Sequence, residues 1–563
     1  MSLKHGSFGE YSISDVGANR FSLPSSSEMA ALDRETIAAG ITGTDLMERA
    51  GSSIAQRVIA AYSNAKKVVV VCGPGNNGGD GLVIADTLAQ AGLSVHRVIV
   101  AAVRYSKEFL GQLAKCKEIT AGPSLAVAQD IFKASYYVFG EAAACEGQLG
   151  VVFSRIDSEE LRELLNSSDL IVDALLGTGQ REAPRGLIAD LIHLINQARA
   201  QSKSTIVVAV DMPTGINGDT GLVHTPCVRA DRTITVQCIK RGVLQFPARD
   251  VCGVIETVDA GISGETCVEY SLITRDNLPE FRPRPGDVHK GMLGRVLVIG
   301  GSLAMPGAPV LSALGALRTG AGIVSRTVCS GWSTISPLPE AMCEVLTGSA
   351  ASFQAGDASI VAEMSSRYEI TVIGPGLGVA AGTADFVAAV LEELRGRGAR
   401  VVVDADALNI IAGRSRTLKG LEAIITPHPG EAARLLGCST TEVQGDRFSA
   451  ARELAQKMGA VVVLKGAGTL IHDGVAGYLV AEGTPYLATP GSGDVLAGVI
   501  AASVMRSRSL LDGALLGVWL HAKAGVAAAE NRGGPILASE IADHVSSLVG
   551  VLESVSLGTE TLI

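Results

Sequence analysis

Short runs of Val and Ile alternate along the chain with longer segments rich in Ala and Leu, whose apolar residues recur at helical spacing. This alternation is typical of βαβ units built around a parallel sheet. It occupies both halves of the chain and gives way to a charged, Pro-rich passage between Gly261 and Gly294. We therefore predict an α/β protein of two three-layer domains, residues 1–262 and 272–563, in which 263–290 form a linker and the start of the second domain.

The pattern also predicts the individual elements. In the first half the expected strands are Val68–Cys72, Val95–Val100, Leu170–Asp173, Thr205–Asp211 and Thr233–Val236. In the second half they are Arg295–Ile299, Ile323–Thr327, Glu369–Ile373, Arg400–Asp404, Glu422–Thr426 and Ala460–Lys465. Helices are expected at Asp45–Tyr62, where Thr44 provides an N-cap, and at Asp494–Met505 and Leu510–Ala529 near the C-terminus.

Composition narrows the class of protein. The 563 residues include 47 Lys and Arg against 57 Asp and Glu, a net charge of −10 that does not favour binding to nucleic acid. We find no apolar run near the roughly 18 residues of a membrane-spanning helix, no secretory signal, and no C-x-x-C pair among the ten Cys. We expect a soluble, cytoplasmic protein without nucleic-acid or membrane partners, whose Gly- and Ala-rich surfaces permit a homo-oligomer.

A glycine-rich loop, "GPGNNGGDG" from Gly73 to Gly81, follows the first of these strands and opens a helix at about Gly79. Backbone N–H groups in such a loop bind phosphate. An ordinary dinucleotide site also needs an acidic residue about 20 positions later, and Ser94–Val103 contains none. Asn76, Asn77 and Asp80 stand where a turn needs only glycine, which points to binding, although a structural turn remains an alternative.

Two further strand ends place polar groups at the same sheet edge. They are "DALLGTG" from Asp173 and "VDMPTG", which contains Asp211 and Thr214. Ligands of open α/β sheets bind beyond the carboxyl ends of the strands. Asn77, Asp173 and Thr214 could give oxygens to a hard cation, and Asp211 could act as an acid or base. Taken singly, each Asp could equally be a cap or a turn former.

With the following "IKRGVLQFPARDVCGVIETVDAGI", these motifs resemble the NAD(P)H-hydrate epimerase domain, also found in apolipoprotein A-I-binding proteins, from about Met29 to Ile262. The resemblance implies a Rossmann-like fold, Asp211 as catalytic acid/base in contact with the substrate, and K⁺ held by Asn77, Asp173 and Thr214. Thr214 replaces the Ser that is frequent in the family and keeps the hydroxyl. The other substrate-binding residues implied are Asn76, Gly78, Gly79, Asp80, Gly177, Thr178, Gly179, Gln180, Arg181, Glu182 and Ala183.

The second half contains "TPGSGDVLAG" at the start of a long helix. N–H groups beside Gly491 and Gly493 lie at the positive end of the helix dipole, where they can stabilise a phosphoryl group in transfer. Asp494 in the first turn can deprotonate an attacking hydroxyl, although it could simply complement the helix N-terminus. The sequence has no Gly-Lys dipeptide, which excludes a Walker A loop.

Three more strand ends in this half carry candidate groups. "KGAGT", Lys465 to Thr469, offers a cation and flexible backbone to phosphates. "GPGLG" from Gly374 follows another strand, and His428 stands between two prolines. A single His can be a ligand or a structural residue, and the sequence leaves both open.

These motifs, with "GRVLVIGGS", "GAPVLSALGALRTGAGIV", "VVDADALN" and "TPHPGEAARLL", resemble the ADP/ATP-dependent NAD(P)H-hydrate dehydratase domain, a relative of ribokinase-like kinases, from Leu272 onward. The resemblance implies a ribokinase-like fold, Mg²⁺, and ADP or ATP as co-substrate. It places the hydrated nucleotide against Ala308, Gly376, His428 and Asp494. It places the adenine nucleotide against Lys465, Gly466, Ala467, Gly468, Thr469 and Gly493.

The fusion of both domains resembles the bifunctional nicotinamide nucleotide repair enzymes of bacteria and predicts two linked reactions. The first domain would interconvert the R and S hydrates of NADH and NADPH through Asp211. In the second, Asp494 would take the hydroxyl proton of the S form, the oxygen would attack ADP or ATP, and phosphate would leave. The alternatives are a ribokinase-like small-molecule kinase and a non-catalytic first domain that only binds ligands.

Overall fold

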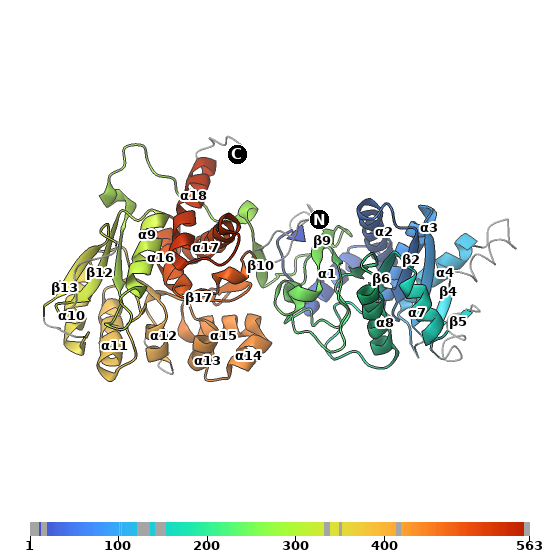
Figure 1. Ribbon diagram of the computed structural model, residues 1–563, viewed down its shortest axis with the longest axis horizontal. Helices are drawn as coiled ribbons and strands as arrows, with labels where there is room; N and C mark the ends of the chain where they lie inside the picture. Colours follow the sequence, from blue (N-terminus) through green and yellow to red (C-terminus); the bar gives the residue numbers. More distant parts are fainter. Residues whose placement is uncertain are drawn as a thin grey trace. The chain divides into compact units, whose positions relative to one another are not determined.

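The computed structural model describes residues 11–12, 20–100, 102, 104–120, 136–140, 154–331, 338–347, 352–412 and 418–556. The chain forms two compact units that divide between Glu269 and Tyr270 (Figure 1). Each unit has its own sheet and its own hydrophobic core. The fold class predicted from the hydrophobic pattern, two α/β units with parallel sheets, is confirmed.

The sheet of the first unit has the order β1-β9-β8-β7-β6-β2-β3-β4-β5 in the part of the chain that the structure describes, and every pairing is parallel. The strands are β1 Tyr11–Ser12, β2 Lys67–Cys72, β3 Ser94–Val100, β4 Tyr136–Phe139, β5 Ser154–Ile156, β6 Leu170–Ala174, β7 Ile206–Val210, β8 Arg232–Val236 and β9 Val254–Val258. The helices are α1 Ser26–Ala38, α2 Gly43–Ala61, α3 Asn76–Gln90, α4 Lys107–Thr120, α7 Ser158–Asn166 and α8 Leu187–Gln201, with 3₁₀ turns η3 Arg241–Leu244 and η4 Ala248–Val251.

The central strand β2 explains why this sheet is covered on both faces. Its run of valines is buried throughout, and alternate residues point to opposite faces. Val68 and Val70 join the core formed with α2, α3 and α4, whereas Val69 and Val71 join the core formed with α7 and α8. An all-apolar strand therefore requires helices on both sides, which gives three layers.

The sheet of the second unit has the order β10-β19-β18-β17-β16-β15-β14-β11-β12-β13 in the described ranges and is parallel except where β18 runs antiparallel to β17 and β19. The strands are β10 Tyr270–Ile273, β11 Arg295–Ile299, β12 Ile323–Cys329, β13 Met342–Leu346, β14 Ile370–Ile373, β15 Arg400–Val403, β16 Glu422–Ile425, β17 Val461–Leu464, β18 Thr469–His472 and β19 Gly477–Val480. The helices are α9 Ala308–Thr319, α10 Ala358–Ser365, α11 Ala381–Gly396, α12 Asp406–Ile411, α13 Pro429–Leu436, α14 Thr440–Gly445, α15 Arg447–Met458, α16 Ser492–Met505, α17 Leu510–Arg532 and α18 Ala538–Ser556. Short 3₁₀ turns are η5 Arg275–Asn277, η6 Lys290–Leu293, η7 Ala355–Asp357 and η9 Pro485–Leu487.

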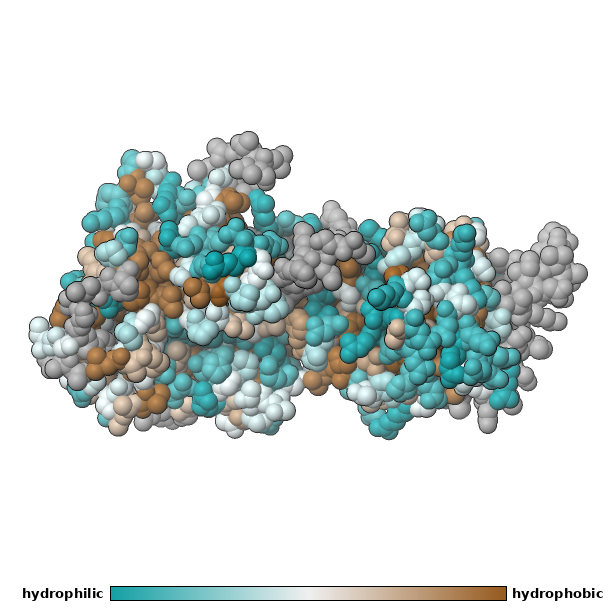
Figure 2. Space-filling view, in the orientation of Figure 1, coloured by the Kyte–Doolittle hydropathy of each residue, from teal (hydrophilic) through white to brown (hydrophobic). Residues whose placement is uncertain are grey.

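Helix α16 is the buried centre of this unit. Figure 1 shows α9, α16, α17 and α18 on one side of the sheet and α11 to α15 on the other. The crossing of α16 with α9 is close: a Cβ added at Gly498 would lie 1.9 Å from the carbonyl oxygen of Ser312. In the view of Figure 2, hydrophobic residues gather on the surface around α9 and α16, whereas the surface around α7 and α8 is largely hydrophilic.

Three predictions about helices need correction. The N-cap of α2 is Thr42, which forms a capping box with Asp45, and not Thr44. The helix after the glycine-rich loop begins at Asn76 and not near Gly79. The expectation that no apolar segment reaches spanning length is wrong for α17, 23 residues long with a mean hydropathy of 1.2 in its most apolar window; 67% of that window is buried, because α17 packs between α16 and α18.

Candidate active sites

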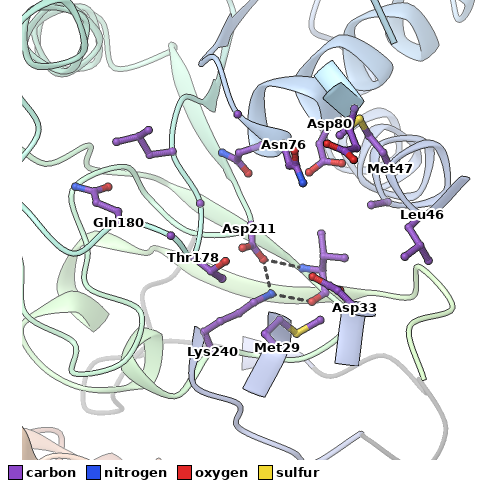
Figure 3. Close-up of a pocket in the computed structure, with 18 of the residues that line it drawn as sticks. Met29, Asp33, Leu46, Met47, Asn76, Asp80, Thr178, Gln180, Asp211 and Lys240 are labelled. Carbon is purple, nitrogen blue, oxygen red and sulfur yellow. Dashed lines mark hydrogen bonds and ion pairs between the residues drawn. The ribbon is translucent and has the colours of Figure 1, made fainter. Parts of the chain in front are cut away.

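A cavity of about 820 Å³ lies at the carboxyl ends of the central strands of the first unit (Figure 3). The loops after β2 and β6, the end of β7 and the segment after β8 line it, together with Met29, Leu46 and Met47 from α1 and α2. In Figure 3, Met29 lies beside Lys240 and Met47 lies beside Asp80. The residues that were predicted to bind substrate and that line this cavity are Asn76, Asn77, Asp80, Gly177, Thr178, Gly179, Gln180, Arg181, Glu182 and Asp211. Parallel strand ends meeting at one edge bring these distant segments together.

Three residues of the predicted set, Gly78, Gly79 and Ala183, do not line the cavity. The two glycines allow the wall to pack. A Cβ added at Gly78 would lie 1.8 Å from the carbonyl oxygen of Gly73, and one at Gly79 would lie 2.5 Å from the sulfur of Met47. In front of them, α3 starts after Gly75 without a side-chain cap, so its first N–H groups remain available to an anion.

Two of the residues suggested for K⁺, Asp173 and Thr214, are hydrogen-bonded to each other, and the third, Asn77, lines the cavity. Asp173 is fully buried and accepts hydrogen bonds from the Thr214 hydroxyl at 2.8 Å, the Thr214 N–H at 2.8 Å and the Leu175 N–H at 3.2 Å. Burial raises the pKa of Asp173 to about 6. The amide nitrogen of Asn77 is buried without a hydrogen-bond partner, and exchanging the amide N and O would place an unpartnered oxygen there. Carboxylate, hydroxyl and amide oxygens on buried side chains fit a hard monovalent cation.

Asp211 follows β7 in a left-handed backbone conformation, φ 67°, that is rare outside glycine. Its N–H donates to the carbonyl of Ile234 at 2.8 Å, which holds the turn. Asp211 is 8% exposed and borders the cavity. Its Oδ1 accepts from the Thr235 hydroxyl at 3.1 Å, from the Val236 N–H at 3.2 Å and from Lys240 (Figure 3).

Lys240 is the main residue of this site that sequence reasoning missed. It is 1% exposed and also donates to the Thr235 hydroxyl at 3.1 Å and the Val236 carbonyl at 2.8 Å. The available signal was its position within the family-like stretch that begins at Ile239. A single lysine after a strand carries no pattern, so only the fold reveals its pairing with Asp211.

Two more aspartates border the same cavity, Asp33 from α1 and Asp80 from α3. Burial raises the pKa of Asp80 well above its usual range, and the negative charge of Asp211 adds to this while Lys240 opposes it. The pKa of Asp33 is also raised, first by burial. Asp33 was not predicted, because an aspartate on an ordinary amphipathic helix carries no motif.

In the second unit the candidate active site lies at the N-terminus of α16. Gly491 adopts φ 86° before the helix, and Asp494 lies in its first turn, half-buried. Burial raises the pKa of Asp494 to about 7, the carboxylates of Asp404 and Asp406 add to this, and Lys465 opposes it. A carboxyl group that titrates near neutral pH is suited to accept a proton from a hydroxyl.

Lys465 lies directly beside this helix terminus, since a Cβ added at Gly493 would be 3.4 Å from its Nζ. The same ammonium is 2.7 Å from Oδ1 of Asp404 and 3.9 Å from Oε2 of Glu431. Asp404 is buried and accepts a 2.7 Å hydrogen bond from Thr426. Asp404 and Glu431 lie in motifs that the sequence singled out, yet their part in this cluster follows only from the meeting of β15, β16 and β17.

The sequence left open whether His428 is a ligand or a structural residue, and the structure gives it a structural role. It is the N-cap of α13, and its Nδ1 accepts from the Gly430 N–H at 3.0 Å. Its Nε2 is 3.3 Å from Glu431, whose pKa burial raises to about 7. Burial lowers the pKa of His428. The half-exposed ring remains accessible to a ligand.

The remaining predicted contacts lie on two loops. Gly376, at φ 67°, packs beside Ala308, because an added Cβ would be 2.9 Å from the Ala308 Cβ. The loop from Lys465 to Thr469 connects β17 to β18 and rests on Arg447, which is 5% exposed and donates to the carbonyls of Leu464 at 3.3 Å and Gly468 at 3.2 Å. Burial lowers the pKa of Arg447 to about 10. Arg447 was missed, because it begins α15 without any motif.

Comparisons with known proteins find similar proteins for both halves of the chain. Residues 43–242 match the family model described as YjeF-related protein N-terminus, and residues 296–547 match the one described as NAD(P)H-hydrate dehydratase. The bifunctional NAD(P)H-hydrate repair enzyme of Moorella thermoacetica is 34% identical over 555 residues, which cover 94% of this chain and 97% of the relative. The Escherichia coli enzyme of the same name is 35% identical over 91% of this chain and 90% of its own length.

A solved structure, the ADP/ATP-dependent NAD(P)H-hydrate dehydratase from Bacillus subtilis co-crystallized with ATP and Mg²⁺, is also similar in sequence. It is 30% identical and covers 49% of this chain and 99% of its own, with a TM-score of 0.43.

Proposed function

The chain belongs to the bifunctional NAD(P)H-hydrate repair enzymes, and from this premise we propose how its residues carry out the two reactions. The protein is an NAD(P)H-hydrate epimerase fused to an NAD(P)H-hydrate dehydratase, and its substrates are small nucleotides. The observation that carries the proposal is Asp494, a carboxyl with a pKa of about 7 at the open N-terminus of α16 and within electrostatic range of Lys465.

We assign epimerisation to the cavity of the first unit. The hydrate carries a hydroxyl on the ring carbon next to the ring nitrogen, so this carbon is a hemiaminal. Either its C–O or its C–N bond can open and close on the other face, and both routes interconvert the R and S forms. Asp211 exchanges the proton of that oxygen, and the N-terminus of α3 with the loop from Gly177 to Ala183 holds the nucleotide.

We propose that Asn77, Asp173 and Thr214 hold K⁺, on the basis of their buried oxygens and the unpartnered Asn77 amide. The ion would supply positive charge beside the phosphates of the substrate. The described residues contain no group of three or more His, Cys, Asp or Glu arranged for a metal ion. Mg²⁺ would then bind mainly through the nucleotide phosphates.

We assign dehydration to the site around Asp494. Asp494 takes the hydroxyl proton, and the oxygen attacks the terminal phosphorus of ADP or ATP, so AMP or ADP leaves. The ring nitrogen then expels phosphate by breaking the C–O bond, and loss of a proton from the neighbouring carbon restores the reduced ring. The loop from Lys465 to Thr469 and Gly493 bind the adenine nucleotide, and Ala308, Gly376 and His428 contact the hydrate.

The kinase alternative predicts a stable phosphorylated product and no role for the first unit. Incubating the protein with purified S hydrate and ADP or ATP distinguishes the two, because repair restores the absorbance of the reduced nicotinamide and releases phosphate. The Asp494→Asn variant lacks the proposed base and should neither restore this absorbance nor release phosphate. A phosphorylated hydrate that accumulates without this absorbance would refute the dehydratase assignment.

We further propose that the enzyme works in the cytoplasm as a homo-oligomer, without nucleic-acid or membrane partners. The cysteines in the part of the chain that the structure describes are free thiols, which fits a reducing compartment. Light scattering of the purified protein measures the oligomeric state, and a monomer at micromolar concentration would refute it.

A further inference from the structure

The carboxylate of Asp211 is anchored through one oxygen. Three donors converge on Oδ1: the Thr235 hydroxyl, the Val236 N–H and the Lys240 ammonium. Figure 3 shows the contact with Lys240. In the described structure no donor reaches Oδ2. One oxygen of Asp211 is therefore fixed, and the other is free at the edge of the cavity.

The hydrogen bonds of Lys240 use all of its N–H donors. An ammonium has three N–H donors, and those of Lys240 go to Asp211, Thr235 and the Val236 carbonyl. Burying a charged group costs free energy unless it is paired, and an apolar side chain of similar size would fill the same space without that cost. The burial of this lysine beneath the cavity indicates a role in the reaction more than in the packing.

We propose that Lys240 is the positioning residue of the epimerase site: it fixes Oδ1 of Asp211 and leaves Oδ2 as the oxygen that takes the proton of the hydrate. This inference rests on the proposed function of the first unit. It goes further by assigning the oxygen that exchanges the proton and the order of events, in which Oδ2 acts first as a base.

The step that follows opens the ring. Oδ2 of Asp211 takes the hydroxyl proton, the oxygen forms a C=O bond, and the C–N bond breaks with its electron pair going to the ring nitrogen, where conjugation with the carboxamide stabilises it. After the aldehyde turns, the nitrogen pair attacks its other face and the new hydroxyl recovers the proton from Oδ2. Atoms, charge and electrons balance without a further reactant.

The other charged groups on the cavity wall belong to separate elements. They are Asp33 on α1, Asp80 on α3, Glu108 on α4, and Arg181 and Glu182 on the loop after β6. Lys240 is the cation that hydrogen-bonds to Asp211. Replacing it with a neutral side chain removes the charged donor that fixes Oδ1, so Oδ2 loses its position toward the hydrate.

The experiment follows conversion of purified R hydrate to S hydrate by chromatography in full-length protein without ADP or ATP, so that dehydration does not occur. For Lys240→Met we expect a kcat lower by about 100-fold and a KM within about threefold. Lys240→Arg keeps the charged donor and should recover at least about tenfold of that loss. Thr235→Val removes one donor to Oδ1 and should lose about tenfold in kcat. Lys203→Met, an exposed lysine, is the matched control and should behave as wild type.

Each outcome decides the inference. A wild-type kcat in Lys240→Met overturns it. An equal loss of kcat in the Met and Arg variants, or a loss that appears in KM instead of kcat, also overturns it, because that is the result of a purely structural role. If Lys240→Met does not fold, as judged by thermal unfolding, the Arg and Thr235→Val variants carry the test, and wild-type kinetics in Thr235→Val overturn the proposed anchoring. Failure of wild-type protein to convert R hydrate refutes the proposed function of the first unit instead.

Discussion

Replacing Asp494 with Asn should abolish dehydration and at the same time stabilise the protein at alkaline pH. The pKa of Asp494 is about 7 in the folded protein, against an ordinary value of 3.8. At about 1.4 kcal/mol per pH unit, ionising this carboxyl costs the folded state about 4 kcal/mol at most. Since the group is half-buried and solvent screens part of this cost, we expect about 2 kcal/mol.

The sign follows from which state binds the proton more tightly. The folded protein holds the proton of Asp494 up to about pH 7, whereas the unfolded chain loses it near pH 4. The stabilisation by the protonated carboxyl is thus fully present below pH 4 and is lost as the pH rises through 7. The Asn variant does not ionise, so its advantage over wild type should be absent at pH 4 and reach about 2 kcal/mol at pH 8.

The assay is chemical denaturation of both proteins at pH 5, 6, 7 and 8, together with dehydratase rates at each pH. Wild-type kcat/KM should fall about tenfold per pH unit below 7, because the base becomes protonated. Asp512→Asn is the matched control, since Asp512 lies in the first turn of α17 and should leave the rate unchanged. An Asn variant that keeps the wild-type rate, or that is less stable than wild type at pH 8, would refute the reasoning.

Three further predictions concern other parts of the structure. Thr214→Val removes one hydroxyl from the proposed K⁺ site, so K⁺ should no longer raise the melting temperature of the first unit or stimulate epimerisation; undiminished K⁺ stabilisation in a thermal titration would contradict this. Arg447→Met removes the hydrogen bonds that Arg447 donates to the carbonyls of Leu464 and Gly468. We expect the KM for ADP or ATP to rise about tenfold and denaturation to show a loss of about 2 kcal/mol, whereas an unchanged KM would disprove the role of Arg447 in supporting the loop. Gly498→Ala places a Cβ 1.9 Å from the Ser312 carbonyl oxygen, so denaturation should show a loss of about 3 kcal/mol, and a stable variant would mean that α9 and α16 are not packed so tightly.

Most of the fold follows from local patterns. Every strand predicted from an apolar run is present within two residues of its expected ends, because a strand buried on both faces leaves an unmistakable run of Val and Ile. The strands not predicted include β1, β9 and β10 and the antiparallel pair β18 and β19. These are mostly short or near a sheet edge, where tertiary pairing and not local sequence selects the strand conformation.

The site residues also divide into those that local motifs predict and those that only the fold reveals. Asp211 and Asp494 were found because each stands at a strand or helix end within a distinctive motif. Their partners Lys240 and Lys465 differ: Lys465 lies in a motif, whereas Lys240 is 29 positions from Asp211 and meets it only when β7 and β8 pair. Arg447 shows the same limit, since a buried arginine cannot be distinguished from a surface one until its helix is packed.

The central claim is that two sites on one chain together repair both hydrate epimers. The most direct measurement follows recovery of reduced nicotinamide from an R and S hydrate mixture with ADP or ATP, under conditions where spontaneous epimerisation is slow, in wild type and in Asp211→Asn. We predict complete recovery by wild type and recovery of only the S fraction by the variant, with an equal initial rate on S. Complete recovery by both proteins at the same rate would contradict the assignment.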